Sequence, residues 1–96
     1  MKLEFHPEAI LEAREARQWY AERNPAAAEA FMNELDLGIE RIVDRPELRA
    51  IHMLGTRRYL FQYFPFAIVY RVKDDVIQVV AIAHGRRKPG YWKERL

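Results

Sequence analysis

The sequence predicts an α+β fold in which an antiparallel helical hairpin packs on a mainly antiparallel four-stranded sheet. Two segments with helical periodicity are joined by a break at Asn24-Pro25, and three runs rich in β-branched and aromatic residues follow in the second half of the chain. A short alternating segment at the N-terminus supplies the fourth strand. With 96 residues and no repeat or linker, residues 1–96 are expected to form a single domain.

The N-terminal strand is predicted over residues 2–6, because Leu3 and Phe5 alternate with polar residues. Pro7 suits the first position of a helix, and Asn24 is placed to cap a second helix that begins at Pro25. The second helix has the wider apolar face, formed by Ala28, Phe31, Met32, Leu35, Ile39, Ile42 and Val43. Gly38 lies within this helix and predicts a close approach to a neighbouring element.

Three further strands are predicted within residues 57–63, 67–72 and 76–83, separated by short turns in an antiparallel meander. Residues 46–56 lack a period and are predicted to be a connection. Alternation places His84 on the same side as Gln78, Val80 and Ile82. One apolar side of these strands is expected to contact the helices, and the other needs cover from another chain or from the C-terminal tail.

Composition excludes several classes of protein. The chain has no cysteine, which excludes a disulfide scaffold and a thiol nucleophile, and its three histidines lack ligand spacing. No metal or cofactor is therefore expected. No apolar run approaches the roughly 20 residues of a membrane span, and the N-terminus does not resemble a signal peptide, so a soluble cytoplasmic protein is predicted.

The charge is divided unevenly along the chain. Residues 1–50 hold seven Lys/Arg against eleven Asp/Glu, a net of −4, whereas residues 51–96 hold nine against three, a net of +6. Where the last apolar strand ends, a histidine, a cationic cluster and two aromatic residues follow, a combination that suits a phosphate-rich or acidic partner. The residues predicted to bind a target or nucleic acid are Arg57, Arg58, Arg86, Arg87, Lys88 and Trp92.

The element order, together with three stretches of the second half, resembles the RelE/ParE family of toxins from type II toxin-antitoxin systems. The stretches are FPFAIVYRV at residues 64–72, DDVI at 74–77 and AHGRRKPGYW at 83–92. The resemblance implies a plasmid-stabilisation or chromosomal module that inhibits growth until a cognate antitoxin neutralises the toxin. It also implies one of two targets, because RelE relatives cleave messenger RNA on the ribosome whereas ParE relatives act on DNA gyrase.

The side chains favour the ParE branch. Metal-free RNA cleavage needs a proton acceptor, a proton donor and cations, for which the candidates are His84, Tyr91 and Arg86. The nuclease branch typically places an arginine after the proline turn, where this chain has Ala67 and Ile68, and Arg71 substitutes only if the register permits. A ribosome-dependent endoribonuclease and a non-toxic binding module remain the alternatives to a gyrase-binding toxin.

The same residues also have purely structural interpretations. His84 could bond to a nearby carbonyl, Tyr91 and Trp92 could pack the C-terminal tail on the sheet, and Arg57 and Arg58 could protect a sheet edge. An uncovered apolar face predicts either binding of the antitoxin or formation of a homodimer.

Overall fold

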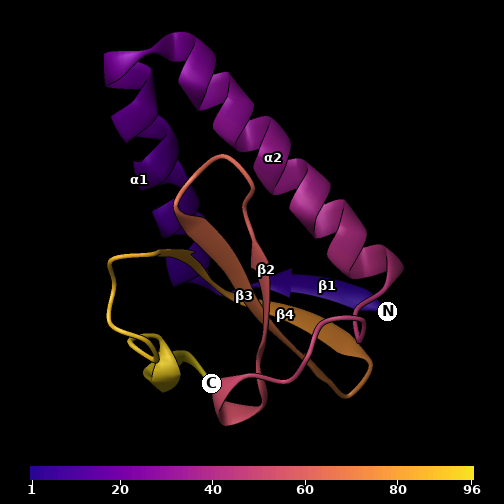
Figure 1. Ribbon diagram of the computed structural model, residues 1–96. Coiled ribbons are helices and arrows are strands. Elements are labelled where there is room, and N and C mark those ends of the chain that lie inside the picture. Colours follow the sequence, from indigo (N-terminus) through magenta and orange to yellow (C-terminus); the bar gives the residue numbers. More distant parts are fainter.

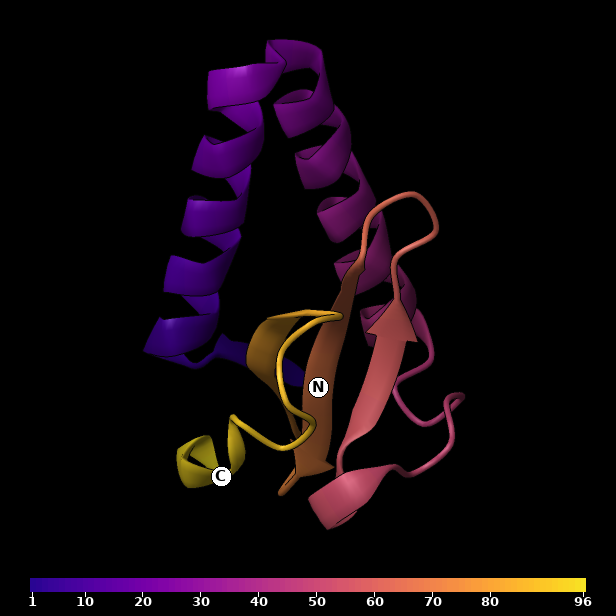
Figure 2. The ribbon, with the colours of Figure 1, turned by 60° about the vertical axis from the view of Figure 1, so that its left-hand side comes forward.

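The computed structural model describes residues 1–96 and confirms the α+β fold. The two helices form an antiparallel hairpin behind the sheet, and the C-terminal tail lies on the opposite side (Figures 1 and 2). Neither helix combines the length and apolar character required to cross a membrane. The elements are β1 (Lys2–Phe5), α1 (Pro7–Arg23), α2 (Pro25–Asp44), β2 (Arg57–Leu60), β3 (Phe66–Lys73) and β4 (Val76–His84), with short 3₁₀ turns at Met53–Gly55 and Lys93–Arg95.

Both helices begin as the sequence predicts, with proline at the first position. The Asn24 side chain accepts a hydrogen bond of 3.0 Å from the amide of Ala26 and so caps α2. The predicted strand over residues 2–6 is one residue too long, because His6 caps α1 instead: its Nδ1 accepts from the amide of Glu8 at 3.1 Å. Histidine is not among the favoured capping residues, which is why the pattern did not indicate this role.

The sheet has the order β1-β4-β3-β2, in which β1 runs parallel to β4 and the other neighbours are antiparallel. Asp74 and Asp75 join β3 to β4 in a tight turn, and both have positive φ, 52° and 63°, as a two-residue hairpin turn requires. Since β1 pairs only with residues 76–79, the second half of β4 has no backbone partner on that edge. This free edge becomes important for the C-terminal tail.

A β-bulge in β4 changes which side chains share a face. Val69 pairs with Ala81 and Tyr70 pairs with Val79, so that Val80 is an extra residue. Val79 and Ile82 therefore both face the helices, whereas Val80 and Ala81 face the tail. The predicted grouping of His84 with Val80 is wrong for this reason, because unbroken alternation does not apply across a bulge.

The main core lies between the helices and the sheet and includes a cluster of stacked and edge-to-face aromatic rings. Phe31 on α2 is fully buried and contacts the rings of Tyr20, Phe61, Phe64 and Phe66 at centroid distances between 5.1 and 5.6 Å. A second, smaller core lies on the other face of the sheet and consists of Val69, Val80, Ala81 and Trp92.

Gly38 provides the close helix–sheet approach that the sequence predicts. A Cβ built at this position would lie 2.7 Å from Cδ1 of Ile68 and within 2.9 Å of the ring of Tyr59. We expect Gly38→Ala to lower the free energy of unfolding by about 1–2 kcal/mol, because overpacking outweighs the gain of about 1 kcal/mol in helix propensity. Urea denaturation measures the difference, and an unchanged or raised stability would contradict the close packing.

Candidate functional site

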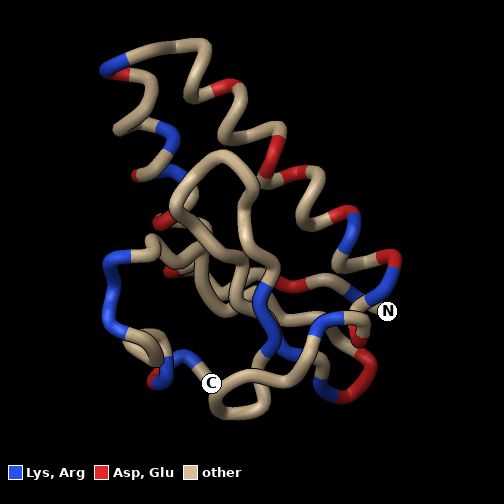
Figure 3. Tube along the Cα trace, in the orientation of Figure 1, with Lys and Arg blue, Asp and Glu red and all other residues tan.

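Three exposed cations follow β4 and a fourth lies on β2. Arg86, Arg87 and Lys88 lie in the loop after β4 and Arg58 lies on β2; the trace in Figure 3 is blue in both segments. Although about 30 residues separate them in the sequence, Arg58, Arg87 and Lys88 line one cavity of about 330 Å³. We call Arg58, Arg86, Arg87 and Lys88 the cationic surface.

The cationic surface is not neutralised from within the chain. The two ion pairs of the protein join Lys2 to Glu4 and Arg95 to Glu12, and neither involves a residue of this surface. Arg87 lies over the ring of Tyr91, with its guanidinium carbon 3.8 Å from the ring centroid, and this contact orients it without removing its charge. The surface therefore has unpaired positive charge available for a partner.

Arg57 and Trp92 do not join this surface. The Arg57 guanidinium donates to the backbone carbonyls of Glu47 and Arg49 and so holds the connection before β2 in place. Trp92 is only 3% exposed and packs on the second core, so its ring cannot stack on a partner. These contacts give both residues a structural role, which depends on how the connection and the tail fold back, so we do not include them in the cationic surface.

His84 has a structural role in ordering the basic loop. Its Nδ1 accepts a hydrogen bond of 3.0 Å from the backbone amide of Arg86, and its ring meets the ring of Phe66 edge to face at 4.9 Å. The partner of the His84 imidazole is therefore a backbone amide and not a backbone carbonyl. Because Nδ1 is an acceptor, the neutral imidazole carries its proton on Nε2.

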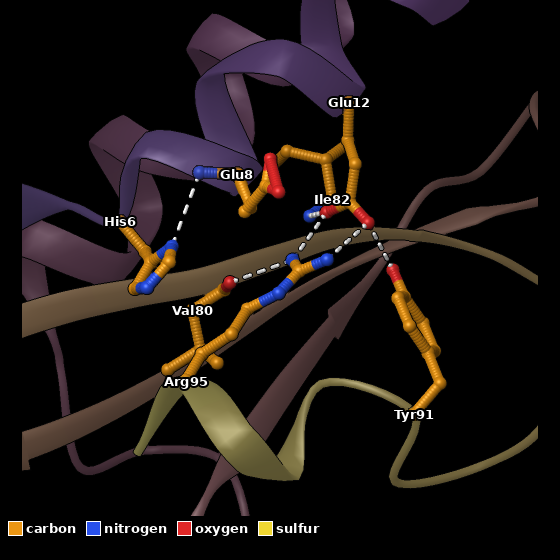
Figure 4. Close-up of polar contacts among 7 residues, drawn as sticks. All are labelled: His6, Glu8, Glu12, Val80, Ile82, Tyr91 and Arg95. Carbon is orange, nitrogen blue, oxygen red and sulfur yellow. Dashed lines mark hydrogen bonds and ion pairs between the residues drawn. The ribbon is translucent and has the colours of Figure 1, made fainter.

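A polar network around Glu12, which the sequence did not indicate as a functional site, fixes the C-terminal tail (Figure 4). The Glu12 carboxylate accepts from both terminal nitrogens of Arg95, at 2.8 and 3.0 Å, and from the hydroxyl of Tyr91 at 2.6 Å. It also accepts from the amide of Ile82 at 3.0 Å, while Arg95 donates to the carbonyl of Val80 at 3.1 Å.

The network occupies the free edge of β4. Backbone groups of Val80 and Ile82 lie beyond the last pairing with β1, and the side chains of Arg95 and Glu12 satisfy them in place of a neighbouring strand. The side chains of Arg95 and Glu12 are 15% and 13% exposed, so the pair is only weakly screened by water. The basic loop is consequently held at both ends, by β4 and by Tyr91.

Tyr91 cannot serve as a ready proton donor in this arrangement. Burial, the hydrogen bond to Glu12 and the negative charge of that carboxylate raise the pKa of Tyr91 far above the ordinary value of about 10. Its hydroxyl already donates a hydrogen bond to the Glu12 carboxylate. The residue therefore anchors the tail.

The raised pKa of Tyr91 predicts how stability depends on pH. A group whose pKa is higher in the folded state contributes its full stability below the unfolded value of about 10, and that contribution is lost as the pH rises through the folded pKa. We expect the free energy of unfolding of the wild type to fall more steeply above pH 10 than that of Tyr91→Phe. Urea titrations between pH 8 and 12 test this, with Tyr63→Phe, at a 79% exposed position, as the control; parallel curves for all three proteins would contradict the role of Tyr91.

The arginine that a nuclease would need after the proline turn is missing from the structure as well. Ala67 and Ile68 are buried, and Arg71 lies five residues beyond the Phe66–His84 pair, roughly 17 Å along β3. Arg71 donates through Nε to Gln78 at 2.6 Å. The register therefore does not permit Arg71 to act beside His84. No group of three or more His, Asp or Glu side chains is close enough to hold a metal ion.

Comparison with solved structures finds the same fold in two toxin systems. A structure of the chromosomal ParDE system from P. aeruginosa is similar with a TM-score of 0.70 and 20% sequence identity, covering 88% of this chain and 95% of the other. The isolated E. coli RelE toxin is similar with a TM-score of 0.61 and 17% identity, covering 97% and 93%. At these identities the similarity shows the fold. No curated protein matches the sequence.

The sequence itself shows the family. Residues 3–89 match the family model described as the ParE toxin of the type II toxin-antitoxin system parDE. The match includes both helices, all of the sheet except Lys2, and the cationic surface. The chain therefore belongs to the ParE toxin family of type II toxin-antitoxin systems.

Proposed function

We propose that this toxin inhibits growth by binding DNA gyrase in the cytoplasm through its cationic surface, without catalysing a reaction of its own. The chain belongs to the ParE family. The resemblance given above implies that ParE toxins act on DNA gyrase, which supports gyrase as the target. The proposal depends on the contacts of two candidate catalytic groups: His84 holds the basic loop, and Tyr91 holds the tail.

RNA cleavage through the 2′-hydroxyl would need a free base and a free acid beside a positive charge. The Tyr91 hydroxyl donates a hydrogen bond to the Glu12 carboxylate, and Nδ1 of His84 accepts from the loop backbone. Arg86 makes no side-chain hydrogen bond or ion pair, and His84 keeps only Nε2 without a partner, so a free acid and a free base are not both present among the three candidates. This arrangement favours a surface that binds over a site that transfers protons.

A cognate antitoxin is the second part of the proposal. The similar P. aeruginosa structure is a ParDE system, in which the toxin belongs to a toxin-antitoxin pair. The second face of the sheet is covered by the tail, so the apolar surface left for the antitoxin lies elsewhere. A groove of about 310 Å³ beside the two helices can receive one or two apolar side chains of a docked helical or extended segment, and the exposed side chains of Phe5 and Ile10 line it together with Met32.

Induced expression in a bacterium, followed by separate measurement of thymidine and leucine incorporation, tests the target. We expect DNA synthesis to stop first and DNA-damage signalling to follow, and purified toxin to inhibit supercoiling by gyrase. Immediate loss of translation with cut messages would refute the proposal in favour of the nuclease. Unimpaired growth would refute it in favour of a non-toxic binding module.

Co-expression with the antitoxin encoded beside the toxin gene tests the second part. We expect growth to be restored and the two chains to elute together in size-exclusion chromatography. Elution of the toxin as an unchanged homodimer in the presence of the antitoxin would contradict this pairing.

A further inference from the structure

The cavity beneath the cationic surface has a lining that selects for negative charge. Eighteen residues line it, and none of them is Asp or Glu, although the chain has 14 such residues. A neighbouring groove of about 840 Å³, which shares His84 and Arg87 with the cavity, is different because Glu12 and Glu15 form part of its wall. Arg58 and Lys88 therefore have no carboxylate in the wall that they line, whereas Glu12 and Glu15 lie on the groove side of Arg87.

The lining also lacks neutral polar side chains. There is no Ser, Thr, Asn or Gln among the eighteen residues, and the hydroxyl of Tyr91 is already bonded to Glu12. Cationic side chains and the histidines His52 and His84 are thus the polar groups of the cavity that can meet a ligand. Such a cavity can hold phosphate, and it lacks the amide side chains that recognise adenine and the carboxylates that recognise cytosine.

Aromatic side chains form the apolar part of the same cavity. Phe64 lies in the turn before β3, Phe66 is the first residue of β3, and Tyr91 lies in the tail; all three are partly exposed. Phosphate-binding cations beside aromatic surfaces are the combination found in sites for single-stranded nucleic acid, where bases stack and the backbone meets Lys and Arg. An acidic peptide would use the charges but would gain little from the aromatic part.

The size of the cavity limits the ligand further. A volume of about 330 Å³ is at the lower end of the roughly 300–1,000 Å³ of small-molecule sites. It suits one nucleotide unit with its base turned inward, which a duplex cannot offer while its bases remain paired and stacked. The cavity has no Ser, Thr, Asn or Gln side chain to recognise a 2′-hydroxyl, and the groups that could meet one are the cations and imidazoles that also meet phosphate.

We propose that this cavity is a sequence-tolerant binding site for single-stranded DNA, in which Arg58, Arg87 and Lys88 hold the phosphate and the aromatic side chains contact the base. The proposal deepens the proposed function, on which it rests for its biological setting, by giving the toxin a direct contact with the DNA that gyrase handles. The binding itself requires only the purified toxin.

Fluorescence anisotropy with a 5′-labelled thymidine 12-mer between 50 and 200 mM salt tests the site. For about three phosphate contacts we expect a plot of log K against log salt to have a slope of about −2. Arg87→Ala combined with Lys88→Ala is expected to weaken binding by at least about ten-fold and to flatten the slope to about −1. The matched control is Arg14→Ala combined with Lys73→Ala, which removes the same charge from exposed positions outside the cavity and is expected to bind like the wild type.

Two further oligonucleotides separate the contribution of base stacking from that of charge, and DNA binding from RNA binding. An abasic 12-mer with the same charge is expected to bind about ten-fold more weakly, because it cannot stack; equal binding would reduce the effect to the attraction of a basic surface and overturn the proposal. A uridine 12-mer that binds at least ten-fold more tightly than the DNA would overturn it in favour of RNA. Absence of any binding would overturn it too, whereas DNA binding without inhibition of gyrase would refute the proposed target and leave this site standing.

Discussion

Replacing Trp92 by alanine is expected to lower the free energy of unfolding by about 3–5 kcal/mol, the range measured for buried tryptophan and phenylalanine side chains. Trp92 is 3% exposed and packs with Val69, Val80 and Ala81, so that it covers the face of the sheet turned away from the helices. Since a domain of this size is stable by about 5–15 kcal/mol, this one change would leave little of the total. Urea denaturation followed by circular dichroism measures the loss.

The Trp92→Ala substitution is also expected to promote self-association of the protein. Without the indole, the apolar side chains of β3 and β4 become an exposed patch, and we expect Trp92→Ala to aggregate at concentrations at which the wild type stays dispersed. Trp19→Ala is the matched control, because Trp19 is 52% exposed at the far end of α1, and its loss is expected to cost about 1 kcal/mol or less. Similar stability of the two variants would show that the tail does not cover the sheet.

Replacing Glu12 by alanine is expected to cost about 2–4 kcal/mol. The change leaves the guanidinium of Arg95 without its carboxylate in a weakly hydrated position, and it removes the acceptor of the Tyr91 hydroxyl and of the Ile82 amide. Because these bonds join α1 to the tail, we also expect limited proteolysis to cut the variant within residues 85–96 sooner than the wild type.

Glu15→Ala is the matched control for this prediction. Glu15 is exposed on the same helix and has no ion-pair partner, so its removal is expected to change stability by less than about 0.5 kcal/mol. A double-mutant cycle with Arg95→Met should give a coupling energy of about 1–3 kcal/mol between positions 12 and 95. Additive effects, together with an unchanged proteolytic pattern, would mean that the network does not hold the tail.

The local signals in the sequence were sufficient for most of the fold. Pro7, Asn24 and Pro25 determine where the helices begin through backbone geometry and capping, both of which depend on a few neighbouring residues. Gly38 indicated a close approach because glycine is unfavourable within a helix unless the missing side chain makes room for something. These features can be predicted from the sequence because each depends on residues within one or two helical turns.

The features that the sequence did not predict depend on distant residues. Glu12 meets Arg95, 83 positions later, and the bulge at Val80 arises from how β4 pairs with β3. One signal for Glu12 was present: it is three residues after Ala9 and four before Ala16, both buried, so a carboxylate lies along the inner stripe of α1. A charge in such a position requires a partner, and the arginine-rich tail was the candidate.

The candidate site was predicted in part. The cations that cluster after the last strand, Arg86, Arg87 and Lys88, are exposed, and the structure brings Arg58 to the cavity that Arg87 and Lys88 line, whereas Arg86 lines the neighbouring groove. Arg57 is the neighbour of Arg58 in sequence but points to the connection before β2, as alternation along a strand requires. Which member of an adjacent pair faces the site could not be decided before the position of that connection was known.

The most direct test of this account compares two triple variants of equal charge in a growth assay under graded induction. Arg58→Ala, Arg87→Ala and Lys88→Ala together remove three cations that line the cavity, whereas Arg14→Ala, Arg45→Ala and Lys73→Ala remove three exposed cations that do not line it. We expect the first variant to require at least about ten times more protein to stop growth than the wild type does. The second variant should remain as toxic as the wild type, and both variants should unfold at similar urea concentrations. Equal toxicity of the two variants would contradict it.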